Sequence, residues 1–195
     1  MADFFVSNFW EEEVGPSQKR PLVRELVADY RNRYGALVGK RKLPSLLVAA
    51  RGASGEIVGC VAIEVSVCVG ERVGMKGRGI NPNSPNAELR PVLANLAVAR
   101  SARRRGLAKR LVKRCEDAAK EWGYDEVLLL VEESNKKARR LYQKLGYRAL
   151  FRDNEAKKIV PSDYVIRDVP CVNVCMRREL NANIFAGLFK ILARQ

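Results

Sequence analysis

The most constraining feature of the sequence is the stretch LANLAVARSARRRGLAKRLV, from Leu93 to Val112. It begins with an extended apolar run that ends at Val98, and an arginine-rich turn then leads to Gly106. After Gly106, apolar residues recur at the spacing of one helix face until Gly123 ends the pattern. The stretch therefore predicts a buried strand, a tight turn and a helix whose apolar side packs against a core.

The turn before this helix has the properties of an anion site. The N–H groups of a first helical turn have no partners within the helix, and the helix dipole adds partial positive charge. Gly106 carries no side chain where an anion would approach the backbone, and the preceding arginines add forked donors. A helix inserted into a nucleic-acid groove is the alternative, but Leu107, Leu111 and Trp122 commit this helix to a core. The pattern therefore favours a phosphate cradle.

Hydrophobic periodicity divides the rest of the chain into further elements. A helix is predicted over Ser17–Gly35, and a β-hairpin over Pro44–Val69 with Gly59 at a bulge. The remaining predictions are a long loop over Gly70–Asn86, a strand over Val92–Val98, a strand over Asp125–Val131, a helix from Ser134 or Asn135 to Gly146, strands over Tyr147–Phe151 and Pro170–Leu180 with a polar loop between them, and an amphipathic helix over 181–195. This order predicts an α/β (α+β) fold, with a mixed central sheet and helices on both faces.

The length of 195 residues suits one domain with short additions. We expect a helical arm over 1–43, the main domain over 44–180, and a C-terminal amphipathic helix over 181–195. That last helix could lie on a membrane, bind a partner or pack against its own domain, and own-domain packing is the simplest expectation. No apolar run is long enough to predict a transmembrane segment.

Composition removes several classes of site. The chain has no histidine, which excludes Ser-His-Asp and Cys-His nucleophile systems and every histidine-containing metal site. The five cysteines form no CxxC pair, and their positions predict buried thiols in a reducing compartment. The net charge of +14 favours an anionic partner such as nucleic acid, a membrane surface or a phosphorylated cofactor. We expect no metal.

The N-terminal segment does not match a targeting signal. Asp3 and the acidic run Glu11–Glu13 are atypical of signal and transit peptides. We therefore expect either that the protein stays where it is made or that this is a trimmed, mature form.

Two motifs together resemble a known family. LANLAVARSARRRGLAKRLV is similar to motif A of the GCN5-related N-acetyltransferases (GNAT), with the signature (Gln/Arg)-x-x-Gly-x-(Gly/Ala), and VEESNKKARRLYQKLGYR resembles motif B. The resemblance spans about Leu46 to Leu180. It implies the GNAT fold, in which two central parallel strands splay apart, here Val92–Val98 and Glu126–Val131, and acetyl-CoA binds between them as co-substrate.

The resemblance also implies roles for particular residues. The backbone of Leu96, Ala97 and Val98 would hydrogen-bond the pantetheine arm, and Asn135, Lys136 and Lys137 would contact the CoA. Ala108 stands where the family more often has a second glycine. The residues implied to surround the diphosphate are Arg103, Arg104, Arg105, Gly106, Leu107, Ala108 and Lys109. Tyr142 would also contact the cofactor and act as general acid toward the departing thiolate.

The base is less defined by the resemblance. Since the chain lacks histidine, Glu88, Glu132, Glu133 or a carboxylate acting through water are the candidates. Glu132 and Glu133 end the strand beside the thioester, and because neighbours in a strand face opposite ways, at most one can act directly. The implied reaction is direct attack of the amine on the thioester in a ternary complex, with a backbone N–H near Val98 holding the oxyanion.

The acceptor and the cellular location are implied only by resemblance to particular branches of the family. The motifs resemble those of protein N-terminal acetyltransferases, so we expect acetylation of protein N-termini, lysine side chains or both. A small-amine acetyltransferase, or a non-catalytic basic module that binds RNA or an anionic assembly, are the alternatives. FFVSNFW and NVCMRREL resemble the plastid branch of plants and algae, which implies a plastid location, with the cytoplasm as alternative.

The segments Gly70–Asn86 and Asp153–Val169 are expected to form the walls of the acceptor groove. The basic surface or the C-terminal helix could attach the protein to a larger assembly.

Overall fold

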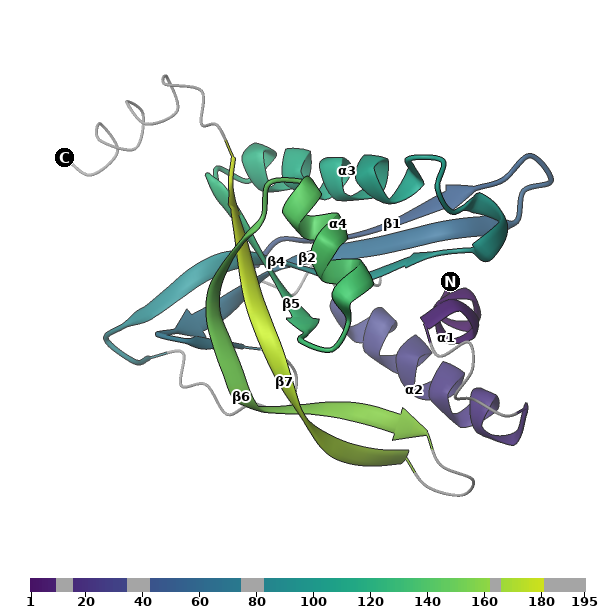
Figure 1. Cartoon of the computed structure of the whole chain (residues 1–195), viewed down its shortest axis with the longest axis horizontal. Coiled ribbons are helices and arrows are strands. Elements are labelled where there is room, and N and C mark those ends of the chain that lie inside the picture. Colours follow the sequence, from purple (N-terminus) through teal and green to yellow (C-terminus); the bar gives the residue numbers. More distant parts are fainter. Residues whose placement is uncertain (10–15, 35–42, 75–82, 162–165, 181–195) are drawn as a thin grey trace.

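The computed structural model describes residues 1–9, 16–34, 43–74, 83–161 and 166–180. Within them a seven-stranded sheet has the order β1-β2-β4-β5-β7-β6, with the short β3 paired to β2 (Figure 1). The strands are β1 (Ser45–Arg51), β2 (Ile57–Val69), β3 (Arg72–Val73), β4 (Ala87–Val98), β5 (Glu126–Glu132), β6 (Arg148–Pro161) and β7 (Ile166–Glu179). The helices are α1 (Ala2–Phe9), α2 (Pro16–Tyr34), α3 (Leu107–Glu121) and α4 (Lys136–Lys144), and a 3₁₀ turn covers Arg100–Ala102. This is the mixed α/β architecture predicted.

The helices cover opposite faces of the sheet because residues in a strand alternate in direction. Val61 and Ile63 of β2 pack in a core cluster with Leu111 of α3. Cys60 of the same strand lies in a separate cluster with Phe5 of α1. Therefore α3 and α4 cover one face, while α1 and α2 cover the other. Among the described residues, no helix is both long and apolar enough to cross a membrane.

The parallel strands β4 and β5 separate soon after they meet. Their register contains two Cα pairs, Val92 with Leu128 and Leu93 with Leu129. Immediately beyond, Asn95 has φ 57° and the pairing of β4 with β2 shifts register. A bulge of this kind bends a strand and interrupts its ladder. The splayed central pair predicted from the sequence is thus confirmed.

The predicted hairpin of β1 and β2 and its bulge are also confirmed. The register skips Val58, because Ala50 pairs with Gly59 while Arg51 pairs with Ile57. A Cβ at Gly59 would lie 3.0 Å from a methyl of Leu111, so only glycine lets α3 pack this closely.

The polar loop predicted between the last two strands is wrong. β6 and β7 continue through it as one long antiparallel hairpin, and the segment outside the description is 162–165. β5 pairs with β7 only as far as Glu132 with Asn173, so among the described residues no third strand joins the outer part of the hairpin, which tolerates polar side chains. The polar residues in this segment therefore indicate an exposed strand and not a loop.

Two smaller differences concern segments around the core, and one further prediction is not tested. The helix α1 was not predicted, and the loop predicted over Gly70–Asn86 contains the two-residue strand β3, while its residues 75–82 lie outside the description. The predicted C-terminal helix over 181–195 also lies outside the described residues.

Candidate functional site

The turn from β4 into α3 has an unusual backbone. Arg104 has φ 63° and Gly106 has φ 76°, both in the left-handed region, and Gly106 is the N-cap of α3. Arginine adopts this region at a cost, whereas glycine does so freely. The side chains of Arg103, Arg104 and Arg105 are exposed, while Leu107 turns into the core.

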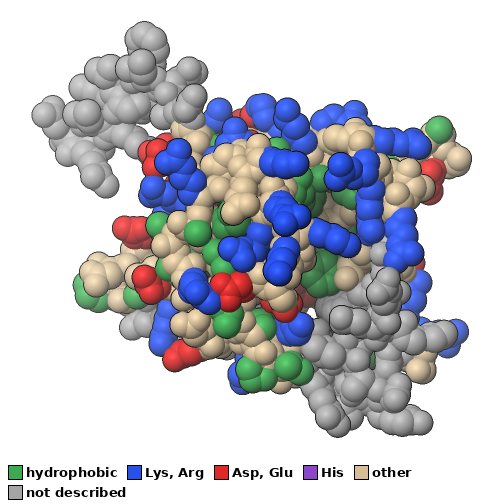
Figure 2. All heavy atoms as spheres, viewed as in Figure 1, with side chains coloured by type: hydrophobic (Ala, Val, Ile, Leu, Met, Phe, Trp, Pro, Cys, Tyr) green, Lys and Arg blue, Asp and Glu red, His purple; other side chains and the backbone are tan. Residues whose placement is uncertain are grey.

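Six consecutive backbone N–H groups in this turn lack a protein acceptor. The first hydrogen bond of the helix runs from the N–H of Arg110 to the carbonyl of Gly106, at 3.1 Å. Within the described part of the chain, the N–H groups from Arg104 to Lys109 donate to no protein group. Figure 2 shows Lys and Arg side chains gathered over the face that carries α3 and α4. The arrangement suits an anion with several oxygens.

The end of β4 is paired on one side. Ala97 and Val98 face Cys60 and Gly59 of β2, and beyond Leu93 no residue of β4 has a partner in β5 among the described residues. The carbonyl of Val98 accepts a hydrogen bond of 2.9 Å from Nε of Arg103. Leu96 and Val98 pack against the α3 side, and Ala97 faces α1. An extended ligand with amide groups could complete this edge.

Asn135 is engaged in capping α4. Its Oδ1 accepts a hydrogen bond of 3.0 Å from the backbone N–H of Ala138, which resolves the open choice between Ser134 and Asn135 as cap. Lys136 and Lys137 follow in the first turn and are exposed. They are therefore available to an anionic ligand, while the Asn135 side chain already has a partner.

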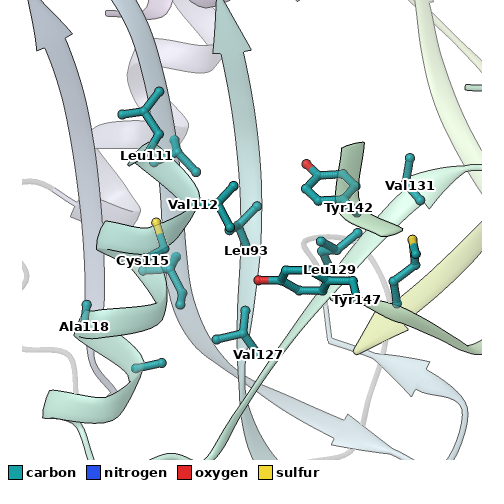
Figure 3. Close-up of a cluster of buried hydrophobic side chains, with 14 of the residues drawn as sticks. Leu93, Leu111, Val112, Cys115, Ala118, Val127, Leu129, Val131, Tyr142 and Tyr147 are labelled. Atoms are coloured by element: carbon teal, nitrogen blue, oxygen red, sulfur yellow. The ribbon is translucent and has the colours of Figure 1, made fainter. Parts of the chain in front are cut away.

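Tyr142 lies in the core between α3, α4 and β5 (Figure 3). The residue is 7% exposed, and its ring packs edge-on against Tyr147 with centroids 5.7 Å apart. Burial, with a smaller contribution from Cys115, raises the pKa of Tyr142 above its ordinary value. In the described residues its hydroxyl has no hydrogen-bond partner, whereas that of Tyr147 donates to Glu116 at 3.1 Å. The Tyr142 phenol is thus a neutral donor not used by the protein.

The two carboxylates at the end of β5 are both ion-paired. Glu132 accepts hydrogen bonds from Ser134 Oγ and from Lys158 Nζ, the latter 3.0 Å from Oε1. Burial raises the pKa of Glu132, but these two bonds outweigh it and hold the pKa below its ordinary value. Glu133 lies 2.7 Å from Arg152. The third candidate base, Glu88, is an exposed residue of β4.

Tyr142 and Glu132 lie on opposite faces of the sheet at β5. Leu128 belongs to the cluster on the face opposite α3 and α4, and the regular register with β7 places Leu130 and Glu132 on that face too. Tyr142 therefore lies on one side of the sheet and Glu132 on the other, with the gap between β4 and β5 between them.

Sequence reasoning missed two residues of this region. Asn95, at the bulge, could have been noticed because Asn is among the few residues that readily adopt positive φ. Lys158 could not, because the contact with Glu132 joins residues far apart in sequence and its segment was predicted to be a loop. The described residues contain no group of three or more acidic or cysteine side chains suited to a metal.

A separate concavity of about 700 Å³ lies on the β1 side of α3. Its floor includes Val48, Val58 and Leu107, and arginines including Arg105 and Arg110 line it. It does not include Tyr142 or Glu132, so it is not the gap between β4 and β5.

Comparison with known proteins gives a match to one family and to several solved structures. The model of the acetyltransferase (GNAT) family matches residues 6–147. A segment of 56 residues, 29% of this chain, is 39% identical to GCN5-related N-acetyltransferase 6, chloroplastic, of Arabidopsis thaliana, and spans 19% of that protein's length.

Solved structures share the fold at low sequence identity. Naa20 of Chaetomium thermophilum, in complex with a bisubstrate analogue, has a TM-score of 0.58 at 18% identity and covers 83% of this chain and 75% of its own. A protein of Pyrococcus horikoshii has a TM-score of 0.57 at 17% identity, covering 92% of this chain and 88% of its own. An Elizabethkingia anophelis protein of the same family, solved with acetyl-CoA bound, has a TM-score of 0.51 at 17% identity, with coverages of 80% and 83%.

Proposed function

Since the chain belongs to the GNAT family of acetyltransferases, we propose that it transfers the acetyl group of acetyl-CoA to protein amines. The acceptor is an N-terminal α-amine, a lysine ε-amine, or both. The observation that carries the proposal is the run of unpartnered N–H groups from Arg104 to Lys109 beside the splayed end of β4. This combination suits a long ligand with a diphosphate at one end and amides along its arm.

In this proposal the diphosphate of CoA lies against the N–H groups of Arg104 to Lys109, with Arg103 at the edge. The pantetheine arm lies along Leu96, Ala97 and Val98, where β4 lacks a second partner. Lys136 and Lys137 add positive charge from α4, and Asn135 fixes the start of that helix by its cap. The acetyl-CoA-bound protein of Elizabethkingia anophelis, which has the same fold, supports this choice of ligand.

Tyr142 is proposed as the general acid. When an amine attacks the thioester carbonyl, the C–S bond breaks and the CoA sulfur leaves as a thiolate that needs a proton. The buried phenol stays protonated because its pKa is raised, and its hydroxyl has no protein partner to compete. Burial of the ring against Tyr147 fixes its direction.

Glu132 is proposed to receive the acceptor amine, and Glu133 remains the second candidate. Glu132 lies on the side of the sheet opposite Tyr142, so an amine and a cofactor can approach the gap from opposite faces. Its lowered pKa makes it a good partner for an ammonium but a weak base. An α-amine, with a pKa near 8, needs little help to become neutral, whereas a lysine near 10.4 needs more.

The charges near the gap favour a peptide over a polyamine. A polyamine would need several carboxylates without other partners, but Glu132 is paired with Lys158 and Glu133 with Arg152. The fold shared with Naa20, whose structure holds a bisubstrate analogue, is consistent with a peptide acceptor.

A plastid location and attachment to a larger assembly are also part of the proposal. The partial relative in Arabidopsis thaliana is described as chloroplastic, which supports the first. The basic face over α3 and α4 supports the second.

A test compares acceptors directly. The protein is incubated with acetyl-CoA and thiol release is followed with a peptide that has a free N-terminus, the same peptide with a blocked N-terminus and one lysine, and spermidine. We expect release with one or both peptides and little with spermidine. Faster release with spermidine would refute the peptide assignment, and no release with any acceptor would refute the transferase activity under these conditions.

A further inference from the structure

A lysine of the protein itself occupies the place proposed for the acceptor amine. Nζ of Lys158 lies 3.0 Å from Oε1 and 3.3 Å from Oε2 of Glu132. Glu132 is the last residue of β5, where that strand has separated from β4. An ammonium is thus already held by the carboxylate at the edge of the gap.

The path of the chain brings this lysine to the gap. Glu132 pairs with Asn173 of β7, and Asn173 pairs with Asp153 of β6, so Lys158 lies five residues beyond that level. The register of β6 shifts between Asp153 and Ala156, and the hairpin curves under the sheet (Figure 1). The long side chain of Lys158 can therefore pass over β7 and reach β5.

We infer that Lys158 is acetylated by the protein's own active site, an inference that rests on the proposed function. Glu132 holds the ammonium of Lys158 at the gap, and the ammonium first loses a proton to water. The freed lone pair attacks the thioester carbonyl, a C–N bond forms and the C–S bond breaks. The second amine proton leaves as the CoA thiolate is protonated, so the products are Nε-acetyl-lysine and CoA.

The modification changes the gap for other substrates. An acetyl-lysine is neutral and cannot form an ion pair, so Glu132 loses the ammonium partner that it has in the unmodified protein. Its carboxylate can then receive the amine of a separate acceptor. Unmodified Lys158 therefore blocks the Glu132 carboxylate, and its acetylation makes this carboxylate available to another acceptor.

Lys113 provides a matched internal control. It too is ion-paired, to Asp117 four residues along α3, and its side chain is 61% exposed against 42% for Lys158. Uncatalysed acetylation in solution would favour the more exposed Lys113. A tethered reaction at the gap favours Lys158, because tethering raises its effective concentration.

The experiment incubates the full chain with acetyl-CoA and no acceptor, and maps acetylated lysines by peptide mass spectrometry over time. We expect Lys158 to be modified at least about tenfold faster than Lys113, with a half-time that does not depend on protein concentration. Equal rates at the two lysines, or a rate that rises with protein concentration, would overturn the inference.

Variants separate this inference from the proposed function. Gly106→Glu, which should weaken acetyl-CoA binding, should slow the modification at Lys158 at sub-saturating acetyl-CoA and leave the slow modification at Lys113 unchanged. Tyr142→Phe, a milder change, should slow Lys158 alone. Should Lys158 stay unmodified while a peptide acceptor is acetylated, the inference is wrong and the proposed function stands. Should neither react in a folded protein, the proposed function fails as well.

Lys158→Arg gives a second readout. Arginine keeps the positive charge beside Glu132 but cannot be acetylated in the same way. We expect the wild type to acetylate a peptide with an initial lag that prior incubation with acetyl-CoA removes, and the variant to remain slow after the same incubation. A variant that is as fast as the pre-incubated wild type would refute the role of Lys158 as a barrier.

Discussion

Two tyrosines in the same cluster, Tyr142 and Tyr147, differ in the hydrogen bonding of their hydroxyl groups. Tyr147 is nearly fully buried and donates to Glu116, which also accepts two hydrogen bonds from Arg178, at 2.7 and 2.9 Å. Tyr142 packs against it but has no such partner in the described residues. The hydroxyl of Tyr147 completes a buried charged network, and that of Tyr142 is the one proposed as the general acid.

Phenylalanine at each position tests this difference. Tyr142→Phe should lower the turnover of acetyl transfer and leave both the melting temperature and the affinity for acetyl-CoA nearly unchanged. Tyr147→Phe should cost about 1 kcal/mol of stability, because Glu116 loses a donor, and should leave turnover nearly unchanged. Steady-state kinetics and thermal unfolding of both variants are the measurements. An unchanged rate in Tyr142→Phe would reduce that residue to packing.

The raised pKa of Tyr142 predicts the shape of the pH profile. A phenol has an ordinary pKa of about 10, and burial shifts that of Tyr142 upward, so the acid form persists throughout the neutral and alkaline range where acceptor amines become neutral. The rate should therefore rise with pH through the pKa of the acceptor and show no fall up to about pH 10. A descending limb near neutral pH, absent from Tyr142→Phe, would contradict the assignment.

At the residue scale the sequence predicts groups that belong to local motifs. Gly106 and Asn135 were identifiable because a turn and a helix cap have signatures within a few positions. The network of Glu116, Tyr147 and Arg178 and the pair of Glu132 with Lys158 join distant positions. No local pattern marks them, since their energies arise only when strands far apart in sequence come together.

At the scale of the elements, the glycine at the start of α3, Gly106, can be compared with the glycine that follows its end, Gly123. Gly106 and Gly123 have φ 76° and 83°, and a Cβ on either would meet nothing within 4 Å. Any side chain at either position therefore costs a similar amount of backbone strain, about 1–2 kcal/mol, without a steric clash.

Glutamate at each glycine separates strain from ligand binding. Gly106→Glu places a carboxylate beside the unpartnered N–H groups and should weaken acetyl-CoA binding at least about tenfold, or about 1.4 kcal/mol. Gly123→Glu should lower the melting temperature about as much as Gly106→Glu does, but should leave acetyl-CoA binding as in the wild type. Titration calorimetry on both variants decides the matter, and equal affinities would show that the diphosphate lies elsewhere.

The bulge in β4 gives a second prediction at this scale. Asn95→Val introduces a β-branched residue that strongly disfavours φ 57°, whereas Asn95→Gly accepts it. We expect the valine variant to lose about 1–3 kcal/mol of stability and to bind acetyl-CoA more weakly, and the glycine variant to keep its affinity. If both variants bind alike, the separation of β4 from β5 does not depend on this bulge.

Elements with strong periodicity were predicted well, and those without it were not. The helices α2, α3 and α4 and the strands β2, β4 and β5 carry clear apolar patterns because each has a buried face or is buried throughout. The outer part of the β6–β7 hairpin lacks such a pattern because its strands pair mainly with each other. Its polar residues are typical of a loop, and the extended form is stabilised by the partner strand together with contacts such as that of Lys158 with Glu132.

At the scale of the whole molecule, the proposed function predicts that positive charge strengthens the binding of acetyl-CoA. Basic side chains gather over α3 and α4, and the chain carries a net charge of +14. Because the ligand is an exposed polyanion, raising salt from about 0.05 to about 0.5 M should weaken acetyl-CoA binding several-fold. Titrations at both concentrations, with pantetheine as an uncharged control, measure this. An affinity independent of salt would show that these cations do not contribute.

The order of the strands in the sheet also means that one half of the sheet is synthesised before the other. One half of the sheet, β1, β2 and β4, is encoded by residues 45–98, and the other half, β5, β7 and β6, by residues 126–179. In the described residues the strands of the two halves pair at two Cα positions, Arg90 of β4 donates a hydrogen bond to Glu126 of β5, and α3 packs on both halves. The gap proposed for the cofactor is therefore the boundary between a piece of the chain made earlier and a piece made later. During synthesis the first piece can form three strands, but it has no opposing wall until the second piece has left the ribosome.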